Sequence, residues 1–226
     1  MRIRKLVKPI IDRVAPPLGH WYMSKTRQLR MRGLRLTIPA GVFPPHFLLS
    51  TSFMMDVMKD QRIEGNTLLE MGAGSGALAL MMARQGAKVT AVDISATAVS
   101  AISENARRNA LPLEVLESDL FSALPGRVFD WILVNPPYYP ANPKTEAEHA
   151  WFCGPEFEYF HRFYSELGNH VHGGSRVWMV LSEDCDLQKL EAIALQHGWA
   201  MASIFNRTKW FERNYIFEIK PLSSVA

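Results

Sequence analysis

Residues 67–80 of this chain read TLLEMGAGSGALAL and decide its fold. The run Thr67 to Met71 is short, apolar and typical of a buried strand, and Ala77 to Gln85 has the spacing of a helix. The turn between them contains three glycines, Gly72, Gly74 and Gly76. Glycines there allow a tight turn and the close approach of a ligand to the backbone. A strand, a glycine-rich turn and a helix in this order predict a ligand site above the turn.

Short apolar runs alternate with helical patterns along the rest of the chain. Strands are expected at residues 88–94, 113–117, 131–134 and 176–181, and helices at residues 51–59, 96–109, 156–169 and 187–197. A short extended segment is expected from Leu34, and residues 201–205 and 215–219 would form a terminal antiparallel pair. This alternation predicts a parallel sheet with crossover helices, the α/β class.

Length and composition indicate one globular domain. The 226 residues allow a sizeable core, with 48% hydrophobic and 21% charged residues. The two cysteines, Cys153 and Cys185, show no disulfide or metal-ligand spacing, so we expect no metal site. No run of 18 apolar residues and no secretory leader occurs, which favours a cytoplasmic protein without a membrane span.

Charge is distributed unevenly. Residues 1–35 hold ten Lys and Arg against one acid, although the net charge is only +3. We divide the chain into a basic N-terminal extension, residues 1–35, and a catalytic domain, residues 36–226. Apolar residues at helical spacing within 3–14 predict a basic amphipathic helix, which could lie on a membrane, serve as a transit peptide or dock against the domain. The basic segment favours RNA or the ribosome as partner; a solvated basic face is the alternative.

One carboxylate next to the glycine turn narrows the ligand class. Glu70, two residues before Gly72, can meet a cationic group and would repel a pyrophosphate. S-adenosylmethionine carries an ammonium and a sulfonium and no phosphate, so Glu70 favours this cofactor. The glycines with Ala77 also satisfy GxGxxA, and a dinucleotide enzyme therefore stays open.

Two further acids follow predicted strands. Asp93 lies 21 residues after Gly72, where an acceptor for ribose hydroxyls is expected. The alternative for Asp93 is a charge at the start of a helix, with Ser95 as the N-cap. Asp119 can accept a hydrogen bond from an adenine amino group; a lone acid in a turn is its alternative.

Asn135, Pro136, Pro137 and Tyr138 directly follow the strand at 131–134. Proline lacks an N–H, so this backbone presents carbonyl acceptors in a fixed direction. The Asn135 side-chain oxygen and the Pro136 carbonyl can accept both hydrogens of a planar NH2 group, and Tyr138 offers a ring face for stacking. A proline turn with a core tyrosine is the alternative. The segment predicts methyl transfer to a planar nitrogen.

These motifs together resemble the class I S-adenosylmethionine-dependent methyltransferases, in particular the small methyltransferase group that includes the HemK-like protein-glutamine enzymes and several RNA adenine and guanine enzymes. LLEMGAGSGALAL, VDIS, SDLF and NPPY carry the resemblance, which extends from about Arg35 to Leu222. It implies a Rossmann-like, seven-stranded, mostly parallel sheet with helices on both faces and a terminal antiparallel hairpin. The implied cofactor-binding residues are Glu70, Gly72, Gly74, Gly76, Asp93, Ile94, Asp119 and Asn135. The implied catalytic residues are Asn135, Pro136 and Tyr138.

The acceptor is less clearly indicated. Residues 149–157 resemble the stretch after NPPY in HemK-like enzymes, with Cys153 and Phe157 in place of two glycines, while residues 41–47 lack the acid usual there. A glutamine of a translation factor is the first hypothesis, an exocyclic amine of RNA the second and a small-molecule amine the third. From other classes, a nicotinamide-dependent oxidoreductase and a catalytically silent adaptor that keeps the cofactor fold are the alternatives.

Overall fold

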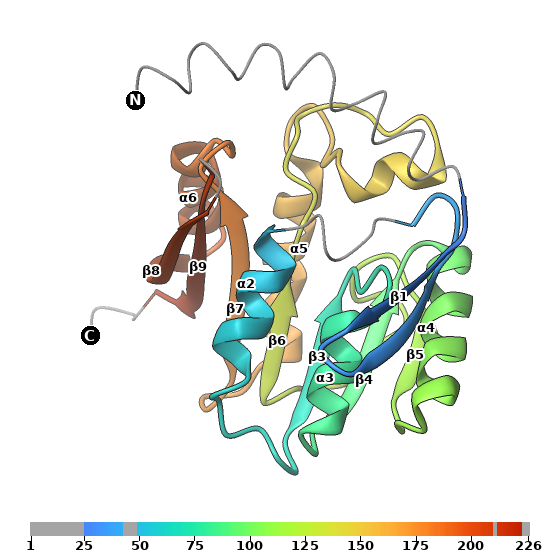
Figure 1. Ribbon diagram of the computed structural model, residues 1–226. Coiled ribbons are helices and arrows are strands. Elements are labelled where there is room, and N and C mark those ends of the chain that lie inside the picture. The colour runs from blue at the N-terminus through green and yellow to red at the C-terminus, as the bar shows by residue number, and fades with distance from the viewer. Residues whose placement is uncertain (1–24, 43–48, 210–211, 223–226) are drawn as a thin grey trace.

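A computed structural model describes residues 25–42, 49–209 and 212–222 (Figure 1). The amphipathic helix expected within residues 3–14 lies outside these ranges, as does most of the segment at 41–47. None of the helices in the described part of the chain is long and apolar enough to cross a membrane.

The described elements alternate along the chain as the sequence predicts. The strands are β1 (Arg27–Met31), β2 (Leu34–Ile38), β3 (Thr67–Met71), β4 (Lys88–Asp93), β5 (Glu114–Glu117), β6 (Trp131–Val134), β7 (Arg176–Ser182), β8 (Trp199–Lys209) and β9 (Glu212–Pro221). The helices are α2 (Leu49–Met58), α3 (Ala77–Arg84), α4 (Ala96–Asn109), α5 (Glu158–Leu167) and α6 (Leu187–Gln196), with short 3-10 turns η1 (Glu146–Ala150) and η2 (Gly168–His170).

Seven strands form one sheet in the order β5-β4-β3-β6-β7-β9-β8. The first five are parallel, β9 is antiparallel to β7, and β8 is antiparallel to β9. The chain moves from β3 outward to β4 and β5 and then returns to β6 on the other side of β3. In such sheets ligands bind at this switch point, outside the carboxyl ends of the strands. The predicted fold class is confirmed.

Helices cover both faces of the sheet. Leu68 packs on the face with α2, α3, α4 and the β1–β2 hairpin, while Leu69, the next residue, packs on the face with α5 and α6. Figure 1 shows α2 and the hairpin in front of the sheet and α5 behind it. The central strand is thus buried on both sides, which explains its unbroken apolar run.

The hairpin is attached to α4 by two asparagines one helical turn apart. Asn105, fully buried, accepts from the Thr37 N–H at 2.7 Å and donates to the Thr37 carbonyl at 3.0 Å. Asn109 makes the same pair of bonds with Arg35, at 2.9 and 2.8 Å. Asn105 also donates to the Ser75 carbonyl at 3.1 Å. The backbone N–H and carbonyl groups of Arg35 and Thr37, at the outer edge of β2, therefore bond to side chains of α4. Through Asn105 the hairpin is also joined to the glycine turn.

Some boundaries differ from the prediction. β8 and β9 extend well beyond the expected residues 201–205 and 215–219. The sequence did not indicate the added residues, such as Arg207 and Arg213, because they are polar and lack an apolar alternation. β1, an arginine-rich strand, was missed for the same reason. The predicted domain boundary at residue 35 falls within β2; the division itself stays a prediction.

Candidate functional site

A cavity of about 630 Å³ lies at the carboxyl ends of β3, β4 and β6, at the switch point of the sheet. It brings together nine of the ten predicted site residues: Glu70, Gly72, Gly74, Asp93, Ile94, Asp119, Asn135, Pro136 and Tyr138. Gly76 is the exception. A Cβ at Gly76 would lie 2.9 Å from Ile102 Cγ2, so this glycine allows α3 and α4 to pack closely.

The glycine turn is open toward the cavity. Gly72 and Gly74 adopt φ of +68° and +55°, and a Cβ added to either would meet nothing within 4 Å. The turn is tied to β4 by the Ala73 N–H, which donates to the Val92 carbonyl at 3.0 Å. A ligand can therefore approach this backbone closely, as the sequence predicts.

Glu70 is buried beneath the turn. Its Oε2 accepts a hydrogen bond from the Ala79 N–H at 2.6 Å, in the first turn of α3. Gly76, at the N-cap position of α3, has no side chain to supply this bond, so Glu70 caps the helix from β3. Burial raises the pKa of the Glu70 carboxyl to about 8, against the Ala79 hydrogen bond, which lowers it. A cation in the cavity would favour the charged carboxylate.

Asp93 links the turn to α4. Its Oδ2 accepts from the Gly74 N–H at 2.8 Å, and its Oδ1 accepts from the Ser95 N–H at 3.0 Å. Ser95 is also the N-cap of α4, accepting from the Ala98 N–H at 3.1 Å. Burial raises the pKa of Asp93, and the two backbone hydrogen bonds oppose it. Each carboxylate oxygen keeps acceptor capacity for a ligand hydroxyl.

Asp119 has a partner that the sequence did not indicate. Arg162 of α5 donates to both of its oxygens, at 3.1 and 3.0 Å. Ile94, whose side chain is 40% exposed, lies on the same cavity wall. The Arg162 pair orients the Asp119 carboxylate in the cavity lining.

The charge of the cavity is strongly one-sided. Its described lining includes five acidic residues: Glu70, which keeps a proton at neutral pH in the cofactor-free protein, and Asp93, Asp119, Glu146 and Glu158. Arg162 is the only Lys or Arg among the described lining residues, and it is paired with Asp119. This lining suits a cation and disfavours a pyrophosphate. Nowhere in the described ranges do three or more His, Cys, Asp or Glu side chains come together to hold a metal ion.

The opposite wall is formed by the segment after β6. The Asn135 Nδ2 donates to the Thr51 hydroxyl of α2 at 3.1 Å. Among the described residues, Asn135 Oδ1 has no hydrogen-bond donor, and it therefore remains an acceptor for a ligand. The sequence does not indicate this contact, because 84 positions separate Thr51 from Asn135.

Aromatic rings surround the same wall. The backbone N–H groups of Tyr138 and Tyr139 both donate to the Trp151 carbonyl, at 3.2 and 2.9 Å. The Tyr138 and Tyr139 ring centroids lie 4.8 Å apart, and those of Tyr139 and Trp151 lie 6.4 Å apart. Burial raises the pKa of the Tyr138 phenol, which stays protonated at neutral pH. Tyr138 can thus supply a ring face but no base.

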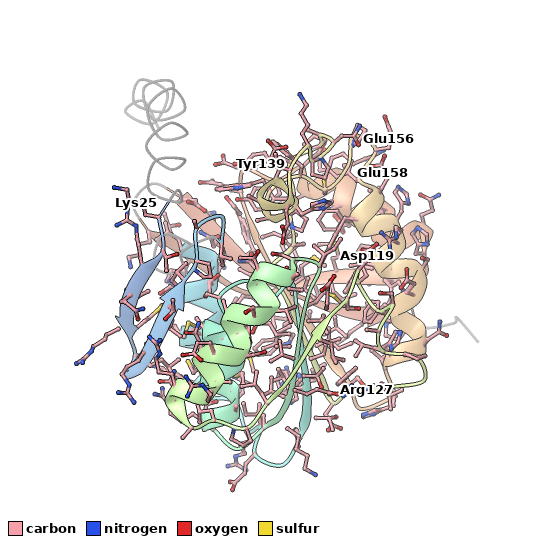
Figure 2. The ribbon with its side chains drawn as sticks, turned by 90° about the vertical axis from the view of Figure 1, so that its right-hand side faces the viewer. Lys25, Asp119, Arg127, Tyr139, Glu156 and Glu158 are labelled. Atoms are coloured by element: carbon pink, nitrogen blue, oxygen red, sulfur yellow. The ribbon has the colours of Figure 1, made fainter. Side chains whose placement is uncertain are left out.

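The segment after Tyr139 covers the cavity, and the sequence marked only its last part, from residue 149. Residues 142–154 line it, and Figure 1 shows this yellow segment, with η1, above the ends of the parallel strands. Ser95 donates to Glu146 of η1, which joins the cover to the start of α4. Figure 2 shows Tyr139 and Glu158 at this end of the molecule, above Asp119.

An acidic switch-point crevice with a glycine turn on one wall and Asn-Pro-Pro-Tyr on the other defines the class of S-adenosylmethionine-dependent methyltransferases. Within this class the chain belongs to the methyltransferase small domain family, which matches residues 33–219.

Curated relatives fall into two groups. The chain is similar to the ribosomal RNA small subunit methyltransferase C of Alcanivorax borkumensis, with 31% identity over 55% of this chain and 36% of the relative. It is also similar to a putative protein N5-glutamine methyltransferase of Methanocaldococcus jannaschii, with 32% identity over 68% of this chain and 79% of the relative. The chain thus spans about a third of the first relative and most of the second.

A solved structure shares the fold. The 16S rRNA N2 G1207 methyltransferase of T. thermophilus, in complex with AdoMet and guanosine, superposes with a TM-score of 0.60. The match covers 86% of this chain and 50% of that chain, at 22% identity. At 22% identity this comparison shows a shared fold only.

Proposed function

We propose that this protein transfers a methyl group from S-adenosylmethionine to the nitrogen of a planar amide or amine. One observation carries the proposal: the Asn135 amide donates to Thr51 and keeps its oxygen as an acceptor in the cavity. An amide held in this way can accept from an NH2 group and orient its nitrogen.

The residues of the cavity fit the cofactor. All four residues line the cavity: Glu70 would favour the ammonium group, Asp93 would accept from ribose hydroxyls, Asp119 would accept from the adenine amine, and Ile94 would pack against the adenine. The open space at Gly72 and Gly74 would hold the methionine portion. When bound, the cofactor supplies a methyl group on a positively charged sulfur, which leaves as a neutral thioether.

The acceptor wall would align the reacting nitrogen. Asn135 Oδ1 and the Pro136 carbonyl accept its two hydrogens, which helps the lone pair localise, and the Tyr138 ring supports the planar group. These residues would hold the nitrogen in line with the methyl group of the bound cofactor, and the surplus proton of the nitrogen would pass to solvent. No side-chain base is needed, so alignment and hydrogen bonding supply the catalysis.

Two acceptors suit this arrangement. A glutamine of a translation factor is the first: the M. jannaschii relative is named for this chemistry, and residues 149–157, which resemble the HemK-like stretch, lie over the cavity. An exocyclic amine of RNA is the second, supported by the A. borkumensis relative and by the basic residues before position 36. Both would place the enzyme in the cytoplasm.

Calorimetry tests the cofactor assignment. S-adenosylhomocysteine is expected to bind, and NAD is expected not to bind, because five acidic residues line the cavity. Tight NAD binding without a response to S-adenosylhomocysteine would show an oxidoreductase instead.

Label transfer tests the acceptor. A lysate is incubated with the enzyme and cofactor labelled on the methyl group, and the label is followed into protein and RNA. Label that survives RNase and is lost with protease supports glutamine. Label that RNase removes supports RNA.

A further inference from the structure

The outward face of the β1–β2 hairpin carries a pair of like charges. Arg30 and Arg35 lie directly opposite each other in the antiparallel register, and both are exposed. Like charges at opposed positions of a sheet destabilise it. Residues 25–42 hold five Lys and Arg and no acid. Neither Arg30 nor Arg35 forms an ion pair with a described carboxylate, so no negative charge among the described residues offsets the repulsion between them.

The neighbouring groups add to this face. Arg35 donates to the Arg108 carbonyl at 3.1 Å, and Arg108 donates to Gln28 Oε1 at 2.6 Å. Thr37 donates to the same Gln28 oxygen at 3.2 Å. The cationic hairpin face, defined as Gln28, Arg30, Arg35, Thr37 and Arg108, is thus a connected polar surface. Figure 2 shows Lys25 at the end of the hairpin, with long side chains pointing away from the domain.

The cationic hairpin face has a fixed position relative to the cavity. Asn105 joins β2 to the glycine turn through Thr37 and Ser75, as described above. Residues 40–42, which follow β2 directly, line the cavity. A polymer bound along the hairpin would therefore lie at a defined distance from Asn135.

The cavity and the cationic hairpin face carry opposite charge. The cavity is lined by five acidic residues and would repel a phosphodiester, whereas the cationic hairpin face attracts one. An RNA acceptor needs both properties, because its base must enter beside the cofactor while its backbone stays outside. A protein glutamine gives the hairpin arginines no role.

We infer that the cationic hairpin face binds the phosphodiester backbone of an RNA acceptor and holds it outside the acidic cavity while one base enters. The inference rests on the proposed function and selects its RNA acceptor. Arg30 and Arg35 donate to phosphate oxygens, whereas Arg108 is paired with Glu104 at 3.2 Å and supports the face through Gln28. Gln28 and Thr37 can contact the sugar hydroxyls.

Fluorescence anisotropy with a labelled RNA stem–loop, repeated over a range of salt concentrations, tests the inference. The double variant Arg30→Gln/Arg35→Gln removes two phosphate contacts, so the slope of log affinity against log salt should fall by about 2, and low-salt affinity by roughly tenfold. The matched control is Lys189→Gln/Lys220→Gln, which removes the same charge from α6 and β9, away from the hairpin. This control should bind like the parent protein.

Folding is checked separately. Removing the Arg30–Arg35 repulsion should leave the melting temperature equal or higher, so lost RNA binding would not report unfolding. Unchanged affinity and slope in the hairpin variant would overturn the inference, as would absence of RNA binding by the parent protein. Loss equal to that of the control would also overturn it. S-adenosylhomocysteine binding, measured on the same samples, shows separately whether the proposed function holds.

Discussion

The two walls of the cavity are built in different ways. In the cofactor wall, residues 70–95, the two carboxyl groups bond to backbone groups of the same segment: Glu70 to Ala79, and Asp93 to Gly74 and Ser95. The acceptor wall, residues 135–138, depends on distant segments, through Thr51 of α2 and the Trp151 carbonyl. A wall whose key bonds lie within one segment can stay specific for one cofactor. A wall that distant segments support can become specific for a different methyl acceptor when those segments differ.

The largest effect on this comparison is expected from Asp93→Ala. The change leaves the Gly74 and Ser95 N–H groups without their acceptor and removes the predicted ribose contact. Charge-assisted hydrogen bonds from Asp93 to two ribose hydroxyls would together be worth about 3 kcal/mol or more, so S-adenosylhomocysteine affinity should fall by at least about 100-fold. Calorimetry measures it, with the exposed Asp60→Ala as control. Equal affinity in both variants would mean that the cofactor wall does not depend on Asp93.

The second effect is expected on the pH dependence of stability, through Glu70. The folded-state pKa of Glu70 is about 8, raised from 4.5 by burial. Between these values the folded protein keeps a proton that the unfolded chain has lost, so this contribution to stability is complete below pH 4.5 and disappears as pH rises to about 8. The free energy of unfolding of the cofactor-free protein should therefore decline over this window.

Denaturant titrations of the parent protein and of Glu70→Gln measure this decline. Glutamine can still accept from the Ala79 N–H but has no proton to lose, so the variant should show a flatter profile. Parallel profiles for the two proteins would show that Glu70 does not hold the proton.

The smallest effect is expected on the acceptor wall, from Thr51→Val. The Asn135 amide loses the acceptor that orients it, at a cost of about 1 kcal/mol, and turnover should fall roughly fivefold. Cofactor affinity should not change, and Thr51→Ser should restore turnover. A loss of cofactor affinity equal to the loss of turnover would show that the two walls are not independent.

The same contrast explains what the sequence could predict. The bounds of β3 and β6 follow from apolar runs, and the glycine turn with Asp93 follows from spacing within 30 residues. Thr51, Arg162 and Glu146 carry no motif, and each reaches the site only through tertiary packing across the sheet. Asn105 looks like an ordinary helix residue, yet it joins the hairpin to the glycine turn.

Asn135→Ala tests the central claim, that the Asn135 amide holds the methyl acceptor while other residues hold the cofactor. S-adenosylhomocysteine affinity by calorimetry and methyl transfer to the labelled lysate fraction are measured on the same preparation, with the exposed Asn206→Ala as control. We predict unchanged cofactor affinity and turnover lowered by roughly 10²- to 10³-fold, the cost of removing one positioned hydrogen-bonding group from a transition state. Turnover equal to that of the control would contradict the claim.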